Sequence, residues 1–161
     1  MNLAISPAVS YNNIMDPIPE LLTLLNKALT MEHSAAIQYL THAQLVSGPG
    51  SAPIIAQLRD SGLDEQKHSE TLRELIGDFL LATPTVEMAP VKSAGGLTDI
   101  LEINLASERE AVSVYEDILA RLAELKADPA VIPIYYKLER EIRLIAIEEM
   151  EHSAELIRLL R

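Results

Sequence analysis

The stretches Glu65-Gln66-Lys67-His68 and Glu149-Met150-Glu151-His152 carry the same Glu-x-x-His pattern twice in one chain. On an α-helix, residues three positions apart lie on one face, so each stretch presents a carboxylate and an imidazole side by side. One such pair is as compatible with a hydrogen bond on a solvated surface as with half of a metal site. Two copies in one chain favour a metal site.

The sequence around both stretches predicts long helices, because apolar residues recur at spacings of three and four and glycine is sparse. The first helix is expected to begin at Asp16-Pro17, with Asp as the N-cap, and to stop in the turn at 47–50. The second runs over 51–81 and the third over 97–126. Asp128-Pro129 repeats the opening of the first helix and starts a fourth that runs to the end of the chain. We expect residues 1–16 to form an N-terminal arm without chemistry, and residues 17–161 to form one domain.

The lengths of the connections predict how the helices are joined. The first and last connections are only a few residues long, which makes their helices antiparallel neighbours. The middle connection, residues 83–96, is long enough to run back along the bundle, so that the second and third helices are parallel. The predicted fold is all-α, a bundle of two antiparallel hairpins joined by a long crossover. A simple up-and-down bundle with a flexible middle loop is the alternative.

The other two helices carry a matching pair of their own. Glu32 is followed seven residues later by Tyr39, and Glu108 is followed seven residues later by Tyr115. Seven residues make two helical turns, so each tyrosine lies on the same stripe as its glutamate. All four predicted helices therefore carry a carboxylate on an apolar stripe.

Four buried carboxylates require compensation, because each would otherwise destabilise the fold by several kcal/mol. The nearby basic residues Lys67, Arg109 and Arg143 fall on other faces. Two divalent cations would balance four glutamates and two neutral histidines; a protonated or water-filled polar network is the alternative. The predicted ligands are a Glu from each of two helices and the Glu-x-x-His pair from each of the others, namely Glu32, Glu65, His68, Glu108, Glu149 and His152.

The chemistry of these side chains limits which metals could bind. The chain has no cysteine, which leaves oxygen and nitrogen ligands and favours iron or manganese over copper(I) and sulfur-bound zinc. We expect Glu65 and Glu149 to bridge the two ions and the other two glutamates to be terminal ligands. Tyr39 and Tyr115 are expected to donate to carboxylates across the bundle and are the candidate catalytic side chains; ordinary core tyrosines are the alternative.

The composition limits the kinds of partner that the protein could bind. The formal net charge of −11 argues against nucleic acid and anionic membranes, which are bound through an excess of Lys and Arg, and is compatible with metal cations. No apolar run is long enough to span a bilayer. The first residues lack a basic leader before an apolar stretch, so we expect no signal peptide and a cytoplasmic protein. A homodimer or a larger homo-oligomer is expected for an acidic bundle of this size.

Residues 21–160 resemble the ferritin-like superfamily, and bacterioferritins most of all. The stretch from Leu25 to Glu32, continuing through Gln38-Tyr39 to His42, is similar to the bacterioferritin first helix, and Asp64-Glu65-Gln66-Lys67-His68 is similar to its second. The resemblance implies a ferritin-like four-helix bundle with a di-iron centre. The activity that it implies is that of a ferroxidase, which oxidises Fe(II) with O2 or H2O2.

The sequence also departs from that family. Bacterioferritins carry a haem-binding Met where this chain has Gln66, so haem is not expected. The chain ends nine residues after His152, without the fifth helix of cage-forming ferritins, so the resemblance does not imply a storage shell. Rubrerythrins resemble the internal symmetry, but their additional third-helix glutamate would fall on Leu105 or Ala111. Two other functions therefore stay open: a rubrerythrin-like peroxidase or oxygenase, which requires a pocket leading to the metals, and a non-catalytic metal-binding bundle.

Overall fold

Four long helices make up most of the computed structural model, which describes residues 17–126 and 132–161. They are α1 (Pro17–Leu45), α2 (Ser51–Glu74), α3 (Leu97–Leu125) and α4 (Ile132–Leu159), and a π-helical turn, η2 (Leu75–Phe79), extends α2. The predicted boundaries are matched closely, and Pro17 is the first residue of α1 as its fixed φ angle favours. The caps expected at Asp16 and Asp128, and the arm 1–16, lie outside the described residues.

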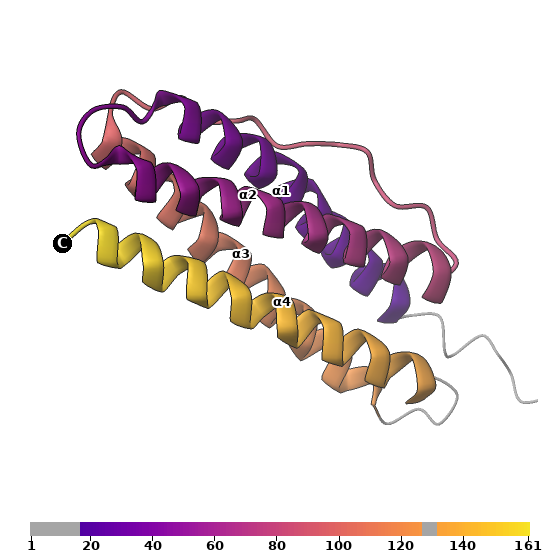
Figure 1. Cartoon of the computed structure of the whole chain (residues 1–161). Coiled ribbons are helices and arrows are strands. Elements are labelled where there is room, and N and C mark those ends of the chain that lie inside the picture. Colours follow the sequence, from indigo (N-terminus) through magenta and orange to yellow (C-terminus); the bar gives the residue numbers. More distant parts are fainter. Residues whose placement is uncertain (1–16, 127–131) are drawn as a thin grey trace, which may run out of the picture.

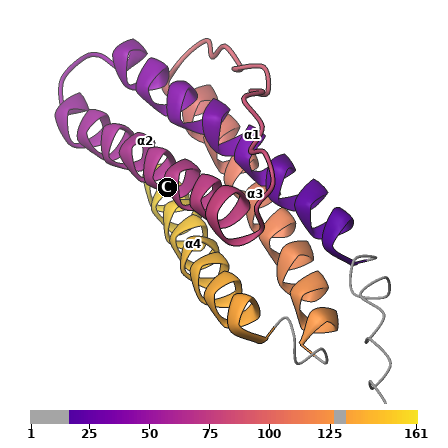
Figure 2. The same cartoon turned by 90° about the vertical axis from the view of Figure 1, so that its right-hand side faces the viewer.

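The helices are connected as two antiparallel hairpins joined by a crossover (Figure 1). The segment between η2 and α3 runs back along the outside of α1, so that α2 and α3 point in the same direction; the turned view shows the same path (Figure 2). The predicted crossover is therefore confirmed and the up-and-down alternative is wrong. The α1–α2 turn is tight because Gly48 and Gly50 have φ angles of 104° and 79°, which glycine adopts without strain.

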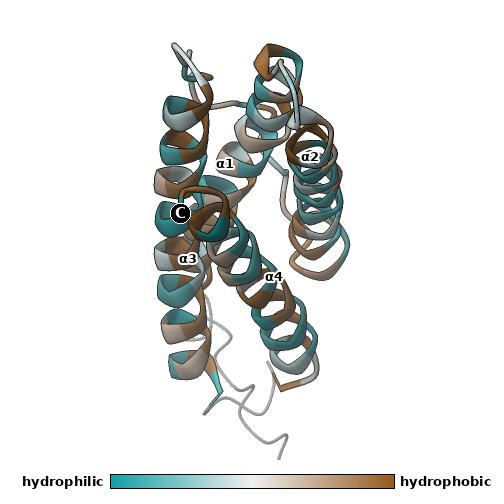
Figure 3. Ribbon diagram, turned by 60° about the vertical axis from the view of Figure 1, so that its left-hand side comes forward, coloured by the Kyte–Doolittle hydropathy of each residue, from teal (hydrophilic) through white to brown (hydrophobic). Residues whose placement is uncertain are grey.

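Apolar side chains from all four helices fill the bundle in two clusters. The larger cluster contains Leu25, Leu72, Tyr115 and Leu138, and the smaller one contains Tyr39, Leu58, Leu101 and Leu156. The ribbons carry alternating hydrophobic and hydrophilic bands rather than uniform ones (Figure 3). In keeping with this banding, none of the described helices has an apolar stretch long enough for a membrane crossing.

The end of the second helix differs from the prediction. Its last turn widens, with Leu80 N–H donating to Leu75 C=O over 3.1 Å, and the chain leaves through Leu81, whose φ angle is +52°. Ala82 N–H then reaches back to Ile76 C=O over 3.0 Å, which closes the helix as a Schellman-type cap does, with leucine where glycine is usual. The apolar pattern through residue 81 predicts continuous α-helix and carries no sign of this turn.

Candidate metal centre

Six side chains from the four helices meet at one level inside the bundle. Each is buried, with relative exposures between 1% and 6%, although all are polar. We refer to them as the six-residue cluster: Glu32 on α1, Glu65 and His68 on α2, Glu108 on α3, and Glu149 and His152 on α4. The predicted residues are thus brought together without exception, while the nearby bases Lys67, Arg109 and Arg143 are exposed.

The six-residue cluster divides into two overlapping groups. In each group, one oxygen or nitrogen from every member lies within 4.8 Å of the others. One group contains Glu32 and His68, the other contains Glu108 and His152, and both contain Glu65 and Glu149. Two ion positions that share two carboxylates are therefore available, in the arrangement that the repeated pattern predicts.

The histidine rings point their Nδ1 atoms at the carboxylates. His68 Nδ1 lies 2.9 Å from Glu149 Oε1, 3.1 Å from Glu65 Oε2 and 3.6 Å from Glu32 Oε2. His152 Nδ1 lies 3.2 Å from Glu65 Oε1 and 3.8 Å from Glu108 Oε2. Because an unprotonated ring nitrogen can bind a cation, the Nδ1 atoms are placed as metal donors.

The outer ring nitrogens meet acidic residues that the sequence argument did not identify. His68 Nε2 lies 2.7 Å from Glu148 Oε2, and His152 Nε2 lies 3.5 Å from Asp64 Oδ2. A carboxylate at this position fixes the tautomer and orientation of a metal-binding histidine. The side chain of Glu148 is also 52% exposed, so it lies on a solvated face of α4 as well as beside the imidazole. The signal was available, since each acid directly precedes the shared glutamate of its own helix.

Two tyrosines hold the remaining glutamates from across the bundle. The Tyr39 hydroxyl donates to Glu108, and the Tyr115 hydroxyl donates to Glu32. Both rings are almost completely buried. Burial, together with the charge of the glutamate that accepts the hydrogen bond, raises the pKa of both tyrosines well above the usual value, so the hydroxyls remain donors at neutral pH. The expected hydrogen bonds across the bundle are present.

Burial and neighbouring charges shift the pKa values of three glutamates of the cluster. Desolvation and repulsion from neighbouring carboxylates raise the pKa of Glu32 and of Glu149 well above the usual value. Burial also acts to raise the pKa of Glu65, but hydrogen bonds from His152, His68 and Glu32 outweigh it and lower that pKa below its usual value. Without metal, the cluster therefore retains protons that cations would displace.

The two histidines of the cluster have raised pKa values, so they hold their protons more strongly than a free imidazole does. Burial acts to lower the pKa of His152, but the nearby carboxylates of Glu108 and Glu65 outweigh it and raise the pKa to about 10. The pKa of His68 is raised further, again against burial, by hydrogen bonds to Glu149, Glu32 and Glu65. Protons on the imidazoles thus supply the positive charge that the buried carboxylates require.

The side chains fit a pair of cations. Glu65 Oε1, Glu149 Oε1 and His152 Nδ1 are buried polar atoms that make no well-aligned hydrogen bond, although each lies within 3.2 Å of an imidazole nitrogen or a carboxylate oxygen. Such atoms are destabilising unless a ligand satisfies them. Carboxylate oxygens and imidazole nitrogens are donors that suit iron and manganese, and the cluster contains no sulfur that would favour copper(I).

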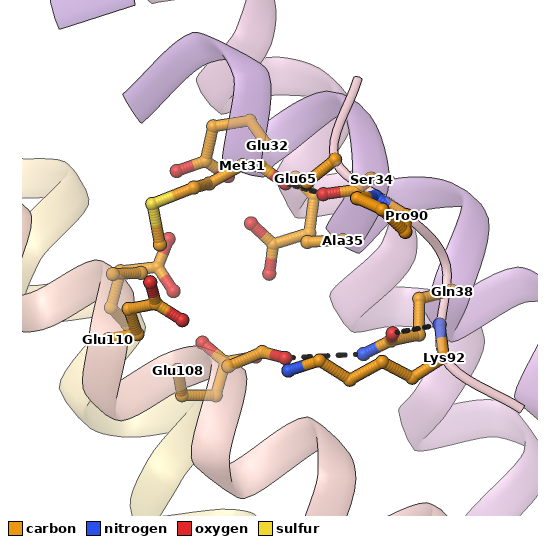
Figure 4. A pocket seen from close by; sticks show the side chains of 14 residues that line it. Met31, Glu32, Ser34, Ala35, Gln38, Glu65, Pro90, Lys92, Glu108 and Glu110 are labelled. Atoms are coloured by element: carbon orange, nitrogen blue, oxygen red, sulfur yellow. Dashed lines mark hydrogen bonds between the residues drawn. The ribbon is translucent and has the colours of Figure 1, made fainter. Parts of the chain in front are cut away.

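A cavity of about 260 Å³ leads to the carboxylates from the side of α1 and α3 (Figure 4). Its exposed rim includes Pro90 and Lys92 of the crossover and Glu110 of α3, and its deeper wall includes all four glutamates of the six-residue cluster. Neither histidine of the cluster lines it. The cavity was expected only under the hypothesis of a substrate-oxidising enzyme.

The remaining histidines, His33 and His42, lie outside the cluster. His33 Nδ1 donates to Glu87 C=O over 2.8 Å, and Arg73 bonds its Nε2 over 2.9 Å. His42 lies between α3 and the crossover. It is completely buried and lies 3.3 Å from Asn104 Oδ1 on α3 and 3.0 Å from Lys92 C=O on the crossover.

The fold and the site define a class: four-helix bundles in which two helices each present a buried Glu and the other two each present Glu-x-x-His. Comparison with known proteins agrees. Residues 22–141 match the family described as the ferritin-like domain. The chain belongs to this family.

Individual relatives show how far the similarity extends. The chain is 30% identical over 152 residues to a bacterial ferritin of Pseudomonas aeruginosa, covering 83% of this chain and 94% of that protein. It is 28% identical over 107 residues to a bacterioferritin of Rhodobacter capsulatus, covering 66% of each, so the chain spans about two thirds of that relative's length.

Solved structures give the same fold. A Bacillus anthracis structure described as ferritin-like, diiron-carboxylate proteins superimposes with a TM-score of 0.82 at 31% identity, covering 91% of this chain and 99% of that one. The R. capsulatus bacterioferritin, described with a metal-free dinuclear site and haem iron, superimposes with a TM-score of 0.76 over 88% of this chain and 84% of that one. Its identity of 24% limits that comparison to the fold.

Proposed function

We propose that this protein is a di-iron carboxylate protein that oxidises Fe(II) with O2 or H2O2. The observation that carries the proposal is the six-residue cluster, in which two overlapping donor groups share Glu65 and Glu149. A homologue described as a diiron-carboxylate protein supports iron over manganese. Under this proposal the shared glutamates bridge, while Glu32 with His68 and Glu108 with His152 each complete one ion position.

Ferrous iron is the substrate of the proposed reaction. Two Fe(II) ions held side by side give up two electrons together, which reduces O2 with two protons to H2O2, or H2O2 with two protons to two waters. The protein keeps the carboxylates oriented through the Tyr39 and Tyr115 hydroxyls, which we propose as its catalytic side chains. The carboxylates of Glu148 and Asp64 orient the two imidazoles through their Nε2 atoms, on the side away from the glutamates of the cluster.

The test compares Glu65→Ala with Glu70→Ala, a matched change at an exposed glutamate of the same helix. Bound metal per chain and the consumption of O2 after addition of Fe(II) are measured together. We expect Glu65→Ala to lose both, because it removes a donor from both groups, and Glu70→Ala to retain both. Undiminished Fe(II) oxidation by Glu65→Ala would overturn the proposal, and metal binding by the wild type without any oxygen consumption would leave a metal-binding bundle.

A second function, a peroxidase or oxygenase acting on a small substrate, is supported by the cavity that opens onto the four glutamates. The two functions differ in whether Fe(III) or an oxidised small substrate accumulates. A ferroxidase retains or releases Fe(III) for each Fe(II) supplied, whereas a substrate-oxidising enzyme turns over repeatedly with a fixed complement of iron. Counting product molecules per bound iron separates the two.

We further propose that the chain forms a homo-oligomer without haem. Exposed apolar side chains on α1 and the crossover support the first part: Ile37 is 46% exposed, Met88 48% and Val86 94%, and together they line a shallow pocket beside α2. Exposed apolar surface of this kind is typical of protein interfaces. Gln66, which has no sulfur to bind haem iron, supports the second part. Light scattering and the visible spectrum of the purified protein test both.

A further inference from the structure

The cavity offers a direct path from solvent to the carboxylates of the six-residue cluster. Its rim residues are exposed and its deeper glutamates are buried, so a small molecule can reach the cluster without a helix having to move. The imidazoles, which come from α2 and α4, do not line it. The volume of about 260 Å³ corresponds to roughly eight or nine water molecules at liquid density, which is enough for a small reactant and too little for a large cofactor.

The crossover wall of the cavity is fixed at Lys92. The Lys92 N–H donates to Gln38 Oε1 over 3.1 Å, and the Lys92 C=O accepts from His42 Nε2 over 3.0 Å. Asn104 Oδ1 accepts from Gln38 Nε2 over 3.0 Å and lies 3.3 Å from His42 Nδ1. All three supporting side chains are buried. The backbone at Lys92 is therefore held from both sides, and its side chain starts from a defined position at the rim.

The charges of the side chains that line the cavity influence which small molecules bind in it. With two divalent cations bound, four glutamates and two neutral histidines sum to zero, which leaves Lys92 and Glu110 as the charged side chains on the cavity wall. Lys92 is the only basic residue among the described residues that line the cavity. In the close-up view its side chain runs from the crossover toward the α3 side of the cavity (Figure 4), and the residue is exposed at the rim. The ammonium group of Lys92 attracts anions to the crossover side of the cavity, while the carboxylate of Glu110 acts against it from α3.

We propose that this cavity binds small monoanions beside the metal centre and that Lys92 is the specificity-determining residue that admits them. The anion of hydrogen peroxide and small carboxylates share this chemistry. The inference rests on the proposed function and extends it, because it assigns the α1–α3 side of the cluster to a small anion once both ions are bound. Lys92 acts at the entrance and is not itself a metal ligand.

The first test asks whether the cavity is open in the metal-free protein. Because the chain contains no cysteine, Ala35→Cys places a single thiol on the cavity wall, while Ala43→Cys places one at a buried position of the same helix away from the cavity. We expect a small thiol reagent to modify the first at least tenfold faster under native conditions. Equal rates would overturn the inference.

The second test measures anion binding with Co(II) in place of iron, so that no turnover is involved. Azide is titrated and followed by the change in visible absorption. We expect Lys92→Gln to weaken azide binding about three- to tenfold at low salt, with the difference shrinking as salt screens the charge, while Lys27→Gln, at an exposed lysine of α1, changes nothing. Competition by formate identifies carboxylates as ligands, and its absence leaves the peroxide anion. Equal azide affinity in the wild type and Lys92→Gln would overturn the inference.

The two tests also separate this inference from the proposed function. If Lys92 controls azide binding and the thiol is accessible, but Fe(II) is not oxidised, the cavity assignment stands and the ferroxidase proposal fails. If Fe(II) is oxidised normally while both cavity tests are negative, the function stands and the cavity assignment fails.

Discussion

Replacing Glu149 with glutamine should stabilise the metal-free protein and weaken metal binding in the same step. Glu149 is 1% exposed, and burial with repulsion from Glu32 and Glu65 raises its pKa well above the usual 4.5. The unfolded chain ionises this carboxyl freely, whereas the folded chain resists its ionisation. Glutamine has nearly the same shape, keeps an oxygen for His68, whose Nδ1 lies 2.9 Å from Glu149 Oε1, and carries no charge in either state.

The expected gain at neutral pH is about 1–3 kcal/mol in the free energy of unfolding, because keeping this carboxyl protonated in the folded chain costs up to about 1.4 kcal/mol for each pH unit above 4.5. For a chain of this length, each kcal/mol corresponds to roughly 2–4 °C in Tm. With saturating metal the order reverses, because the wild type gains about 2.7 kcal/mol when free metal is at a hundred times its Kd. The variant, which lacks one shared ligand, gains much less.

The pH dependence supplies a sharper test. A raised folded-state pKa means that the folded chain binds more protons than the unfolded chain, so stability falls as pH rises above about 4.5, by up to about 1.4 kcal/mol per pH unit for each extra proton. His152, whose pKa is raised from 6.5 to about 10, contributes in the same direction between those values. Glu65, with a lowered pKa, is ionised in both states across this range and adds no slope. Glu149→Gln should therefore flatten the decline without abolishing it.

The assay is urea denaturation of chelator-treated protein at several pH values between about 5 and 9. Glu151→Gln, at an exposed residue of the same helix, is the control, and its stability should change by no more than about 0.5 kcal/mol. A metal-free Glu149→Gln protein that is less stable than the wild type, or that has an unchanged pH slope, would refute the argument that the buried carboxylate strains the metal-free fold.

Three further changes test the surroundings of the site. Leu81→Gly should raise the free energy of unfolding by about 0.5–1 kcal/mol, because it relieves a φ angle of +52° at a side chain that is 86% exposed; a loss of stability in thermal unfolding would contradict this. Gly62→Ala should destabilise the protein by about 1–2 kcal/mol, although alanine has the better helix propensity, because the new Cβ would lie 3.1 Å from Leu40 Cγ and 3.2 Å from Tyr39 Cβ. Denaturant unfolding measures the change, and a gain in stability would show that α1 shifts to accommodate the methyl group. Tyr115→Phe should destabilise by about 1–3 kcal/mol and weaken metal binding, because the buried Glu32 loses its donor; unchanged metal affinity would show that the hydroxyl plays no part.

The fold and the six-residue cluster follow from the sequence because both depend on regular spacing. A step of three residues joins Glu65 to His68, and a step of seven joins Glu32 to Tyr39, so helical geometry alone places these side chains on shared faces. The length of the segment 83–96 then fixes the topology. Compensation of buried charge supplies the remaining step, since no base lies on the same stripes.

The cavity and its wall could not be predicted in this way. Gln38 and His42 contact the backbone of Lys92, and Asn104 supports these two side chains from α3. Lys92 lies on a non-helical segment, and a segment without periodicity gives no indication of which of its residues face the bundle. The same applies to Gly62, whose close approach to Tyr39 depends on the distance between two helices. The π-helical turn at 75–79 depends on one extra residue per turn, which the apolar pattern accommodates without a visible break.

The internal repeat predicts two equivalent ion positions, yet the structure makes them different. His68 Nδ1 faces three carboxylates within 3.6 Å, whereas His152 Nδ1 faces two within 3.8 Å. Behind the rings, Glu148 reaches to 2.7 Å where Asp64 stops at 3.5 Å, a difference that one methylene group explains. Because carboxylates behind a histidine increase its basicity and fix its orientation, the position completed by His68 and Glu32 has the better-held imidazole. A near-repeat in sequence thus gives matching donor atoms whose imidazoles have unequal support.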